Sequence, residues 1–332
     1  MTIPLIRVDH LSKVFRVPER EPGLKAAMRA LFHRTYRQVC AVQDISFTIG
    51  EGEIVGLIGP NGAGKTTTLK ILAGLLYPTS GEVTLAGYIP WQRRAAFLNQ
   101  IGMVQGNKSQ LLWDIPAMDS YHVLSEIYRI PMRQFKETLD ELVRLLQMED
   151  LLTRPIRNLS LGERMKCELV AGLLHRPKVL FLDEPTLGLD VTTQNRLRLF
   201  IAEYNRRFGA CILLTSHYMA DVEQLCPRVI LIHNGQLLHD GALQGLAERM
   251  APFKLIRVTL DGGVAINRGL PQLPEGAELL ERNENHLILR CSRSAAPVVT
   301  SCLLSACPVT DLTVEDPPIE AVIDQVYREG IA

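Results

Sequence analysis

The sequence contains no long apolar run and no targeting segment. No apolar stretch approaches the roughly 18 to 20 residues that a membrane-spanning helix needs. The first residues also lack the basic start, the apolar core and the small-residue cleavage site of a secretory signal peptide. We therefore expect a chain that does not cross a membrane itself.

Paired cysteines and an excess of charge are missing as well. The seven cysteines are an odd number without a Cys-x-x-Cys pair, which disfavours a disulfide framework or a zinc site and favours a reducing compartment. The 36 Lys and Arg residues balance the 36 Asp and Glu residues, whereas nucleic-acid-binding domains are usually basic. No nucleic-acid partner is expected.

The composition is that of an ordinary globular protein of about two domains, with 332 residues of which 47% are hydrophobic. Short apolar runs at 53–59, 179–182 and 211–214 alternate with helical patterns, which predicts a mostly parallel α/β sheet. From about residue 241 the pattern changes to that of a small α+β unit. We therefore place an α/β domain in residues 1–240 and an accessory domain in residues 241–332.

Two segments of the first domain are distinctive. Region 105–158 is mainly helical in pattern, with Pro131 between two helices. In segment 18–39, apolar residues recur at helical spacing from Leu24 to Val39 and basic residues fall elsewhere, which predicts a basic amphipathic helix. This helix either lies at a membrane surface or packs on its own domain or on a partner.

A glycine-rich segment carries the clearest chemical motif. Residues 59–66, GPNGAGKT, match the pattern G-x-x-x-x-G-K-[ST] and stand between a predicted strand and a predicted helix, as a phosphate-binding loop does. The glycines let backbone N–H groups face phosphates, Lys65 reaches the terminal phosphates and Thr66 is a ligand for Mg²⁺. The alternative is a glycine-rich turn without nucleotide. The predicted nucleotide-binding residues are Gly59, Pro60, Asn61, Gly62, Ala63, Gly64, Lys65, Thr66 and Thr67.

The apolar run at 179–182 ends in two acids, Asp183 and Glu184. Parallel strands present such carboxylates at the carboxyl edge of the sheet, where a nucleotide lies. Asp183 is then placed to hold Mg²⁺, and Glu184 to act as general base on an attacking water. Acidic strand ends also occur for solubility, and it is the phosphate-binding loop upstream that favours the catalytic interpretation.

Two further segments resemble motifs of one family. Residues 159–164, LSLGER, resemble the signature loop of ABC-transporter ATPases, whose common form is LSGGQ, with Leu161 and Glu163 in place of a glycine and the glutamine. Residues 185–190, PTLGLD, resemble the D-loop of that family, and His217 resembles its switch histidine. These motifs follow one another in the family's order.

The resemblance extends over about residues 5 to 240 and implies a P-loop NTPase fold with a helical subdomain. It also implies ATP and Mg²⁺ as cofactors. In this family two ATPase subunits close head to tail around two ATP molecules, so the implied partner is a second copy of the chain or a paralogous subunit. The catalytic residues implied by the motifs are Lys65, Glu184 and His217.

Other residues have implied roles in holding the nucleotide. Ser160 and Gly162 of one subunit would bind the γ-phosphate held by the other, and Asp190 lies in the D-loop beside them. Phe15 occupies the position that stacks on adenine in this family, and the alternative is a core aromatic.

One position departs from the family's pattern. The glutamine loop of ABC ATPases follows the strand that ends near Val104, and the spacing places Asn107 where the glutamine is expected. Asn has the same amide on a stem shorter by one methylene, so it reaches Mg²⁺ only if the loop moves inward. Gln105 is the alternative ligand.

A transporter function would need separate membrane permease subunits, which dock beside the helical region of ABC ATPases. Trp113 is a candidate docking aromatic, with core packing as the alternative. The layout of one ATPase domain and a short tail most resembles ATPase subunits of bacterial drug, lipid or polysaccharide exporters. We therefore expect an export ATPase in the cytoplasm, peripheral on the inner face of the cell membrane through its permease. The alternatives are an importer ATPase and a soluble ABC ATPase of translation or DNA repair.

Overall fold

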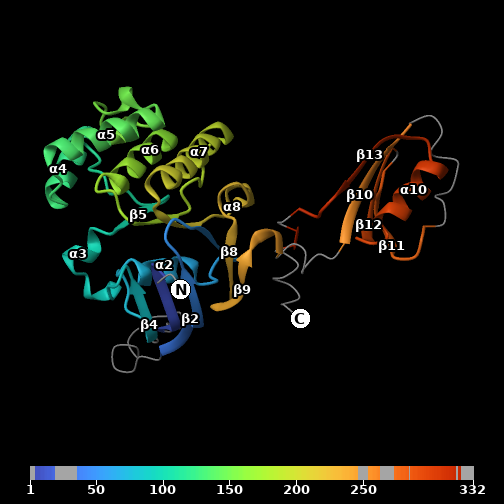
Figure 1. Cartoon of the computed structure of the whole chain (residues 1–332), viewed down its shortest axis with the longest axis horizontal. Coiled ribbons are helices and arrows are strands. Elements are labelled where there is room, and N and C mark those ends of the chain that lie inside the picture. The colour runs from blue at the N-terminus through green and yellow to red at the C-terminus, as the bar shows by residue number, and fades with distance from the viewer. Residues whose placement is uncertain are drawn as a thin grey trace, which may run out of the picture. The chain divides into compact units, whose positions relative to one another are not determined.

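The computed structural model describes residues 4–18, 36–245, 253–261, 273–283, 285–318 and 321–322. The chain divides into two compact units, Met1–Ala242 and Leu243–Ala332 (Figure 1). Each unit has a hydrophobic core of its own. No helix among the described residues is long and apolar enough to cross a membrane.

The centre of the first unit is a six-stranded sheet in the order β5-β6-β7-β3-β8-β9. Every neighbouring pair is parallel except β8 and β9, which form an antiparallel hairpin. Residues of the inner strands are buried on both faces, which explains their continuous apolar sequence. The predicted parallel α/β sheet is thus confirmed. Its strands are β3 (Ile54–Ile58), β5 (Ile101–Gln105), β6 (Val179–Asp183), β7 (Cys211–Thr215), β8 (Arg228–His233) and β9 (Gln236–Ala242).

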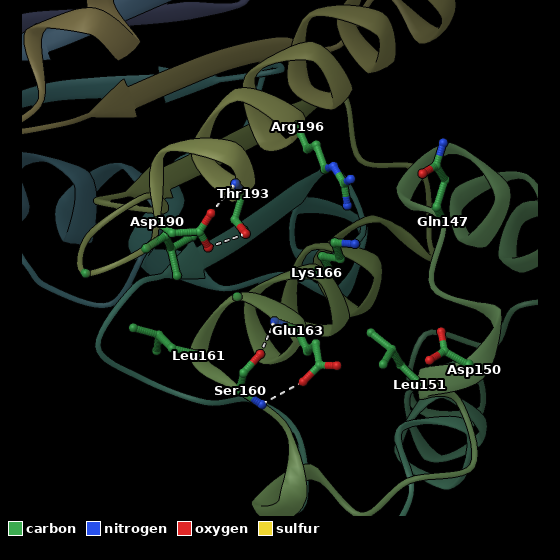
Figure 2. Close-up of a pocket in the computed structure, with 13 residues that line it drawn as sticks. Gln147, Asp150, Leu151, Ser160, Leu161, Glu163, Lys166, Asp190, Thr193 and Arg196 are labelled. Carbon is green, nitrogen blue, oxygen red and sulfur yellow. Dashed lines mark hydrogen bonds between the residues drawn. The ribbon is translucent and has the colours of Figure 1, made fainter.

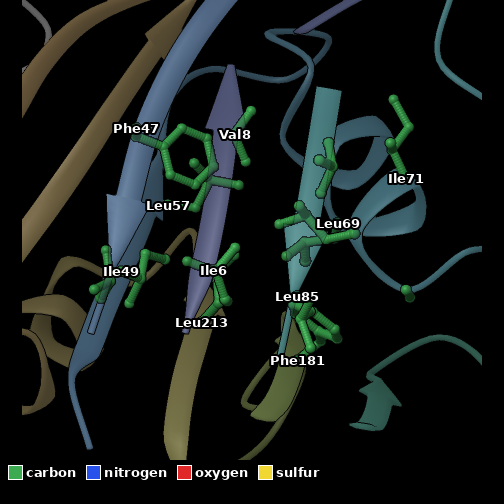
Figure 3. Packing of buried hydrophobic residues seen from close by; sticks show 14 of the residues in the cluster. Ile6, Val8, Phe47, Ile49, Leu57, Leu69, Ile71, Leu85, Phe181 and Leu213 are labelled. Carbon is green, nitrogen blue, oxygen red and sulfur yellow. The ribbon is translucent and has the colours of Figure 1, made fainter. Parts of the chain in front are cut away.

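A second, antiparallel sheet has the order β2-β1-β4, with β1 (Ile6–Pro18), β2 (Tyr36–Ile49) and β4 (Ser80–Leu85). Its apolar side chains pack toward those of the central strands and of the helix α2 (Lys65–Leu72) (Figure 3). The side chains labelled there are Ile6, Val8, Phe47, Ile49, Leu57, Leu69, Ile71, Leu85, Phe181 and Leu213. This core fixes the segment on each side of residues 59–64.

The prediction of a helix over 18–39 is wrong at both ends of that segment. Pro18 is the last residue of β1, and residues 36–39 belong to β2, where Val39 pairs with Phe15. The two strands pair as far as Pro18 and Tyr36, so cross-strand hydrogen bonding outweighs the helical spacing of apolar residues there. Residues 19–35 of the predicted helix lie outside the described residues.

The helices of the first unit lie between its strands along the chain. Within the predicted helical region, α4 and α5 are separated at Pro131, which stands immediately before α5, whereas residue 105 still belongs to β5. Helix α2 ends at Leu72, and Gly74 then turns the chain with φ of +70°. The remaining helices are α3 (Ala95–Leu98), α4 (Ala117–Ile127), α5 (Met132–Leu146), α6 (Leu161–Leu173), α7 (Val191–Phe208) and α8 (Met219–Leu225). Short 3₁₀ turns lie at Pro90–Gln92, Glu149–Leu151 and Ile156–Asn158.

The second unit is an antiparallel sheet, β11-β12-β10-β13, with helix α10 packed on its core side. Strand β11 was not predicted, because its sequence AELLER has charged residues at half of its positions. After β13, Ala321 and Val322 are also helical. The elements are β10 (Phe253–Leu260), β11 (Ala277–Arg282), β12 (His286–Ser292), α10 (Ala296–Ala306) and β13 (Val309–Glu315).

Candidate functional site

The glycine-rich loop connects β3 to α2 and fits closely against its neighbours. A Cβ atom on Gly59 would lie 2.1 Å from the carbonyl oxygen of Ile232, and one on Gly64 would lie 2.3 Å from that of Ala41. Only glycine fits at these two positions. The loop leads directly into the first turn of α2. Backbone N–H groups there have no helical partners and can bind an anion.

Lys65 is the first residue of α2 and only 6% exposed. Its Nζ donates hydrogen bonds to the carbonyl oxygens of Gly59, at 2.6 Å, and Pro60, at 3.0 Å. Burial lowers the pKa of Lys65, while the nearby carboxylates of Glu184 and Asp183 oppose that shift. The ammonium group is thus held inside the loop, where phosphate oxygens would be stronger acceptors than neutral carbonyls.

The Asp183 carboxylate, at the end of β6, gathers side chains from three other segments. The Thr215 hydroxyl donates to its Oδ1 at 2.8 Å and the Thr66 hydroxyl at 3.2 Å. The Gln105 amide Nε2 donates to its Oδ2 at 3.2 Å. Hydroxyl, carboxylate and amide oxygens are the ligands that Mg²⁺ prefers, so this donor set fits that ion.

No group of three or more His, Cys, Asp and Glu residues among the described residues could hold a metal by itself. Mg²⁺ sites of nucleotide enzymes commonly use one or two carboxylates together with phosphates and water. The arrangement at Asp183 is therefore suited to a cation that arrives with a nucleotide.

The structure separates the two candidates for the loop glutamine. Gln105 ends β5 directly beside Asp183, with which it is paired in the parallel register. Asn107 is exposed, and no hydrogen bond joins its side chain to Asp183 among the described residues. Of the two, Gln105 is the residue that lies against the Asp183 carboxylate.

Glu184 and His217 form a close pair at the same edge of the sheet. Nε2 of His217 lies 2.7 Å from Oε1 of Glu184, and both side chains are partly exposed. Glu184 has φ of +57°, which is uncommon for a residue other than glycine. The backbone N–H of Glu184 donates to the carbonyl oxygen of Thr215 at 3.0 Å. A Cβ atom on Gly106 would lie 2.2 Å from the carbonyl oxygen of Glu184. The loops after β5, β6 and β7 thus interlock around Glu184.

The residues that resemble the signature loop, Ser160 and Gly162, lie at the start of α6. Ser160 is the N-cap of α6 in a capping box: its Oγ accepts from the Glu163 N–H at 3.3 Å, and its own N–H donates to Glu163 Oε2 at 2.8 Å. Ser160 and Gly162 line an open pocket of about 670 Å³ between the ends of α5, α6 and α7 (Figure 2). No residue of the glycine-rich loop lines this pocket.

Asp190 lines the same pocket from the start of α7, where it is the N-cap. Its carboxylate accepts from the Thr193 N–H at 3.0 Å and from the Thr193 hydroxyl at 2.6 Å. These hydrogen bonds lower the pKa of Asp190. The predicted site residues therefore form two groups, one around Lys65 and Asp183 and one around Ser160 and Asp190.

Phe15 lies near the end of β1, where it pairs with Val39 of β2. Its ring is half-buried, and Nζ of Lys13 lies 5.1 Å from the ring centroid. The ring is therefore not enclosed in the core. Sequence reasoning missed Thr215 at the Asp183 carboxylate, although the polar end of the apolar run CILLT next to β6 was a signal for it.

Comparison with known proteins agrees with this geometry. A family model described as ABC transporter matches residues 42–187, and a model described as EvrA-like ABC transporter, C-terminal domain, matches residues 252–315. The chain is 36% identical over 217 residues to the ABC transporter ATP-binding protein NatA of Bacillus subtilis, a match covering 65% of this chain and 88% of NatA.

Another relative and a solved structure extend the comparison. The Nod factor export ATP-binding protein I of Ralstonia nicotianae is 31% identical over 250 residues, covering 74% of this chain and 76% of the relative. A solved ATP-binding subunit of an ABC transporter superposes with a TM-score of 0.61 and 27% identity, covering 74% of this chain and 92% of that one.

The capping box yields a prediction for stability. Replacing Glu163 by Ala removes its hydrogen bond to the Ser160 N–H, so we expect a loss of about 0.3 to 1.5 kcal/mol at pH 7 in urea unfolding. Hydrogen bonds from Ser160 lower the pKa of Glu163 below the usual 4.5. A carboxylate with a lowered pKa stabilises fully above its usual value and loses that effect as pH falls through the folded value.

The stability difference between the parent chain and Glu163→Ala should therefore shrink below about pH 4.5. Glu163→Gln is the matched control, because Gln can keep the capping box without a charge. Its difference from Glu163→Ala should change little with pH. A parent-minus-Ala difference that stays constant down to pH 3 would show that the charge is not involved.

Proposed function

This chain belongs to the family of ABC transporter ATP-binding proteins and is an ATPase; from this premise we propose that its ATP hydrolysis drives export through separate membrane permease subunits. The observation that carries the proposal is the assembly of Lys65, Asp183 and the Glu184–His217 pair at one edge of the central sheet. These are the groups that a phosphoryl-transfer site needs: a phosphate-binding cation, a ligand for Mg²⁺ and a base.

The chemical roles follow from the contacts. We assign Lys65 to the β- and γ-phosphates of ATP, and Thr66, Gln105 and Asp183 to Mg²⁺. When bound, Mg²⁺ neutralises charge on the phosphate oxygens. To act as a metal ligand, Gln105 turns its amide so that Oε1 replaces Nε2 toward the ion.

Glu184 accepts a proton from the water that attacks the γ-phosphorus in this proposal. Nε2 of His217 is within hydrogen-bond distance of Oε1 of Glu184 and so fixes the direction of the carboxylate. The second oxygen, Oε2, remains for the water.

The separation of the two residue groups supports a dimeric site. Ser160, Gly162 and Asp190 line a pocket without any residue of the glycine-rich loop. A second copy placed head to tail would bring its own Ser160 to the ATP held by Lys65. ATP then binds the closed dimer better than the open one, and its hydrolysis releases the dimer.

An apolar groove of about 490 Å³ lies where β5, α3 and α4 approach one another. Leu75 and Ile127 line it and are 49% and 66% exposed, with Arg93 and Arg129 also in the lining. We propose that a helix of the permease docks here, which would place the ATPase on the inner face of the cell membrane. Trp113 is 50% exposed and belongs to the same helical region, with the Arg164 guanidinium 5.7 Å from its ring centroid.

The export direction rests on relatives such as the Nod factor export ATP-binding protein. Purification of the tagged chain from a detergent extract of its host tests the transport assignment. We expect an integral membrane protein to co-purify, and Ile127→Asp in the groove should reduce its recovery at least about tenfold because a charge cannot enter an apolar contact. Leu199→Asp is the control, since Leu199 is 72% exposed on α7 outside the groove. Recovery of ribosomes or DNA without a membrane protein would contradict transport.

The assignment of the base predicts a trapped state. Glu184→Gln should bind ATP with near-parental affinity but hydrolyse it at least about a hundredfold more slowly, because the amide cannot accept the proton. With ATP it should elute as a dimer in size-exclusion chromatography. Lys65→Ala is the contrasting variant and should lose ATP binding. Near-parental turnover of Glu184→Gln would remove Glu184 from the catalytic role.

The geometry around Asp183 predicts which loop residue contacts the metal. Gln105→Ala should raise the Mg²⁺ concentration needed for half-maximal ATPase activity, because one oxygen ligand is lost. Asn107→Ala, two residues further along the same loop, should leave it within about twofold of the parent, because Asn107 is exposed. The opposite result would assign the metal to Asn107 and imply that the loop moves inward when nucleotide binds.

A further inference from the structure

A buried ion pair between α7 and α8 takes no direct part in the ATP hydrolysis proposed for Lys65, Asp183 and Glu184. Nε of Arg198, on α7, donates to Oδ1 of Asp221, on α8, at 2.6 Å. The side chains are only 6% and 1% exposed. Arg198 also donates to Asn195 Oδ1 at 2.6 Å and to Gln194 Oε1 at 3.2 Å. The pair is thus fully enclosed, and leaving either charge without its partner would be costly.

The second oxygen of Asp221 holds the two loops that carry Glu184 and His217. Oδ2 accepts from the Ser216 hydroxyl at 2.6 Å and from the Thr186 hydroxyl. Thr186 comes two residues after Glu184, and Ser216 comes immediately before His217. One carboxylate oxygen therefore contacts both catalytic loops.

The hydrogen bonds of Ser216 also hold the backbone beyond His217. Its Oγ accepts from the Tyr218 N–H at 3.0 Å while its hydroxyl hydrogen points to Asp221. His217 is thus held between two anchored neighbours, although its own ring is partly exposed. Nε2 of His217 thereby lies 2.7 Å from Oε1 of Glu184.

The same network reaches the D-loop. Nε2 of Gln194 donates to the carbonyl oxygens of Leu189, at 3.1 Å, and Thr186, at 3.4 Å. Leu189 precedes Asp190, and Asp190 lines the pocket of about 670 Å³ that Ser160 and Gly162 also line. The Arg198 guanidinium therefore connects to the D-loop through Gln194 and to the Glu184–His217 pair through Asp221.

From these contacts we propose that Asp221, held by Arg198, is a positioning residue that sets the distance between Glu184 and His217 through Thr186 and Ser216. The proposal rests on the ATPase role of that pair. In this proposal the hydroxyl groups of Thr186 and Ser216 act by binding Asp221, and neither residue contacts the nucleotide or the metal. A displacement of about 1 Å at a catalytic group can cost on the order of a hundredfold in rate, so loss of one anchor affects turnover more than binding.

The experiment removes one hydroxyl at a time, because Asp221 variants leave Arg198 unpaired and can fail to fold. Ser216→Ala and Thr186→Val should each lower kcat about tenfold while the KM for ATP stays within about twofold. Ser216→Thr and Thr186→Ser keep the hydroxyl and should recover most of the lost kcat. Ser125→Ala controls for the loss of a buried hydroxyl elsewhere: Ser125 is 3% exposed on α4 and donates to the His122 carbonyl oxygen. It should leave kcat unchanged.

A double substitution separates positioning from a general loss of stability. In the His217→Ala background, Ser216→Ala should lower kcat by no more than about twofold further, because Ser216 acts through His217. Independent, multiplicative losses would overturn the proposal, as would parental kcat in both single hydroxyl deletions. Failure of the ATPase function itself is distinguishable, since the parent chain would then show no Mg²⁺-dependent hydrolysis.

Discussion

Hydrogen bonds to the Asp183 carboxylate connect segments that are far apart in the sequence. Thr66 is the second residue of α2, Gln105 ends β5 and Thr215 ends β7, and the side chain of each donates to the same carboxylate at the end of β6. These segments meet because the strands are parallel and neighbours in the sheet, so that their carboxyl ends share one edge. The polar groups would be costly to bury alone and are satisfied by one another. The meeting of these side chains at one edge of the sheet thus depends on the strand order.

Much of this edge could be predicted from the sequence, because local signals and sheet position agree there. The apolar runs of β3, β6 and β7 are too continuous for exposed strands, and the glycine-rich loop follows one of them. The position of Gln105, rather than Asn107, beside Asp183 could not be predicted by counting along the chain. It depends on the register that pairs Gln105 with Asp183, and register is a property of two strands together.

One wrong prediction and two features that were not predicted have a common physical reason. Val39 fits a helical spacing in sequence, but pairing of β1 with β2 extends past it and determines its conformation. Strand β11 has little apolar pattern of its own and is held by its pairing with β12. Asp221 lies four positions after His217, and Arg198 lies eight positions after Asp190; neither belongs to a local motif. Long-range pairing and burial, which a single sequence does not display, decided all three cases.

The strained backbone of Glu184 shows why so many contacts converge behind the edge. A non-glycine residue with φ of +57° costs on the order of 1 kcal/mol or more, so it persists only where its surroundings fix it. The Thr215 backbone holds its N–H, and Gly106 packs so closely on its carbonyl that no side chain fits there. The hydroxyl of Thr186, bound to Asp221, anchors the chain two residues later. These contacts hold the turn that directs the Glu184 carboxylate toward His217 at 2.7 Å. The buried ion pair and the Glu184–His217 pair therefore belong to one hydrogen-bonded network, in which enclosed charges help to hold a partly exposed carboxylate in a conformation that its own backbone disfavours.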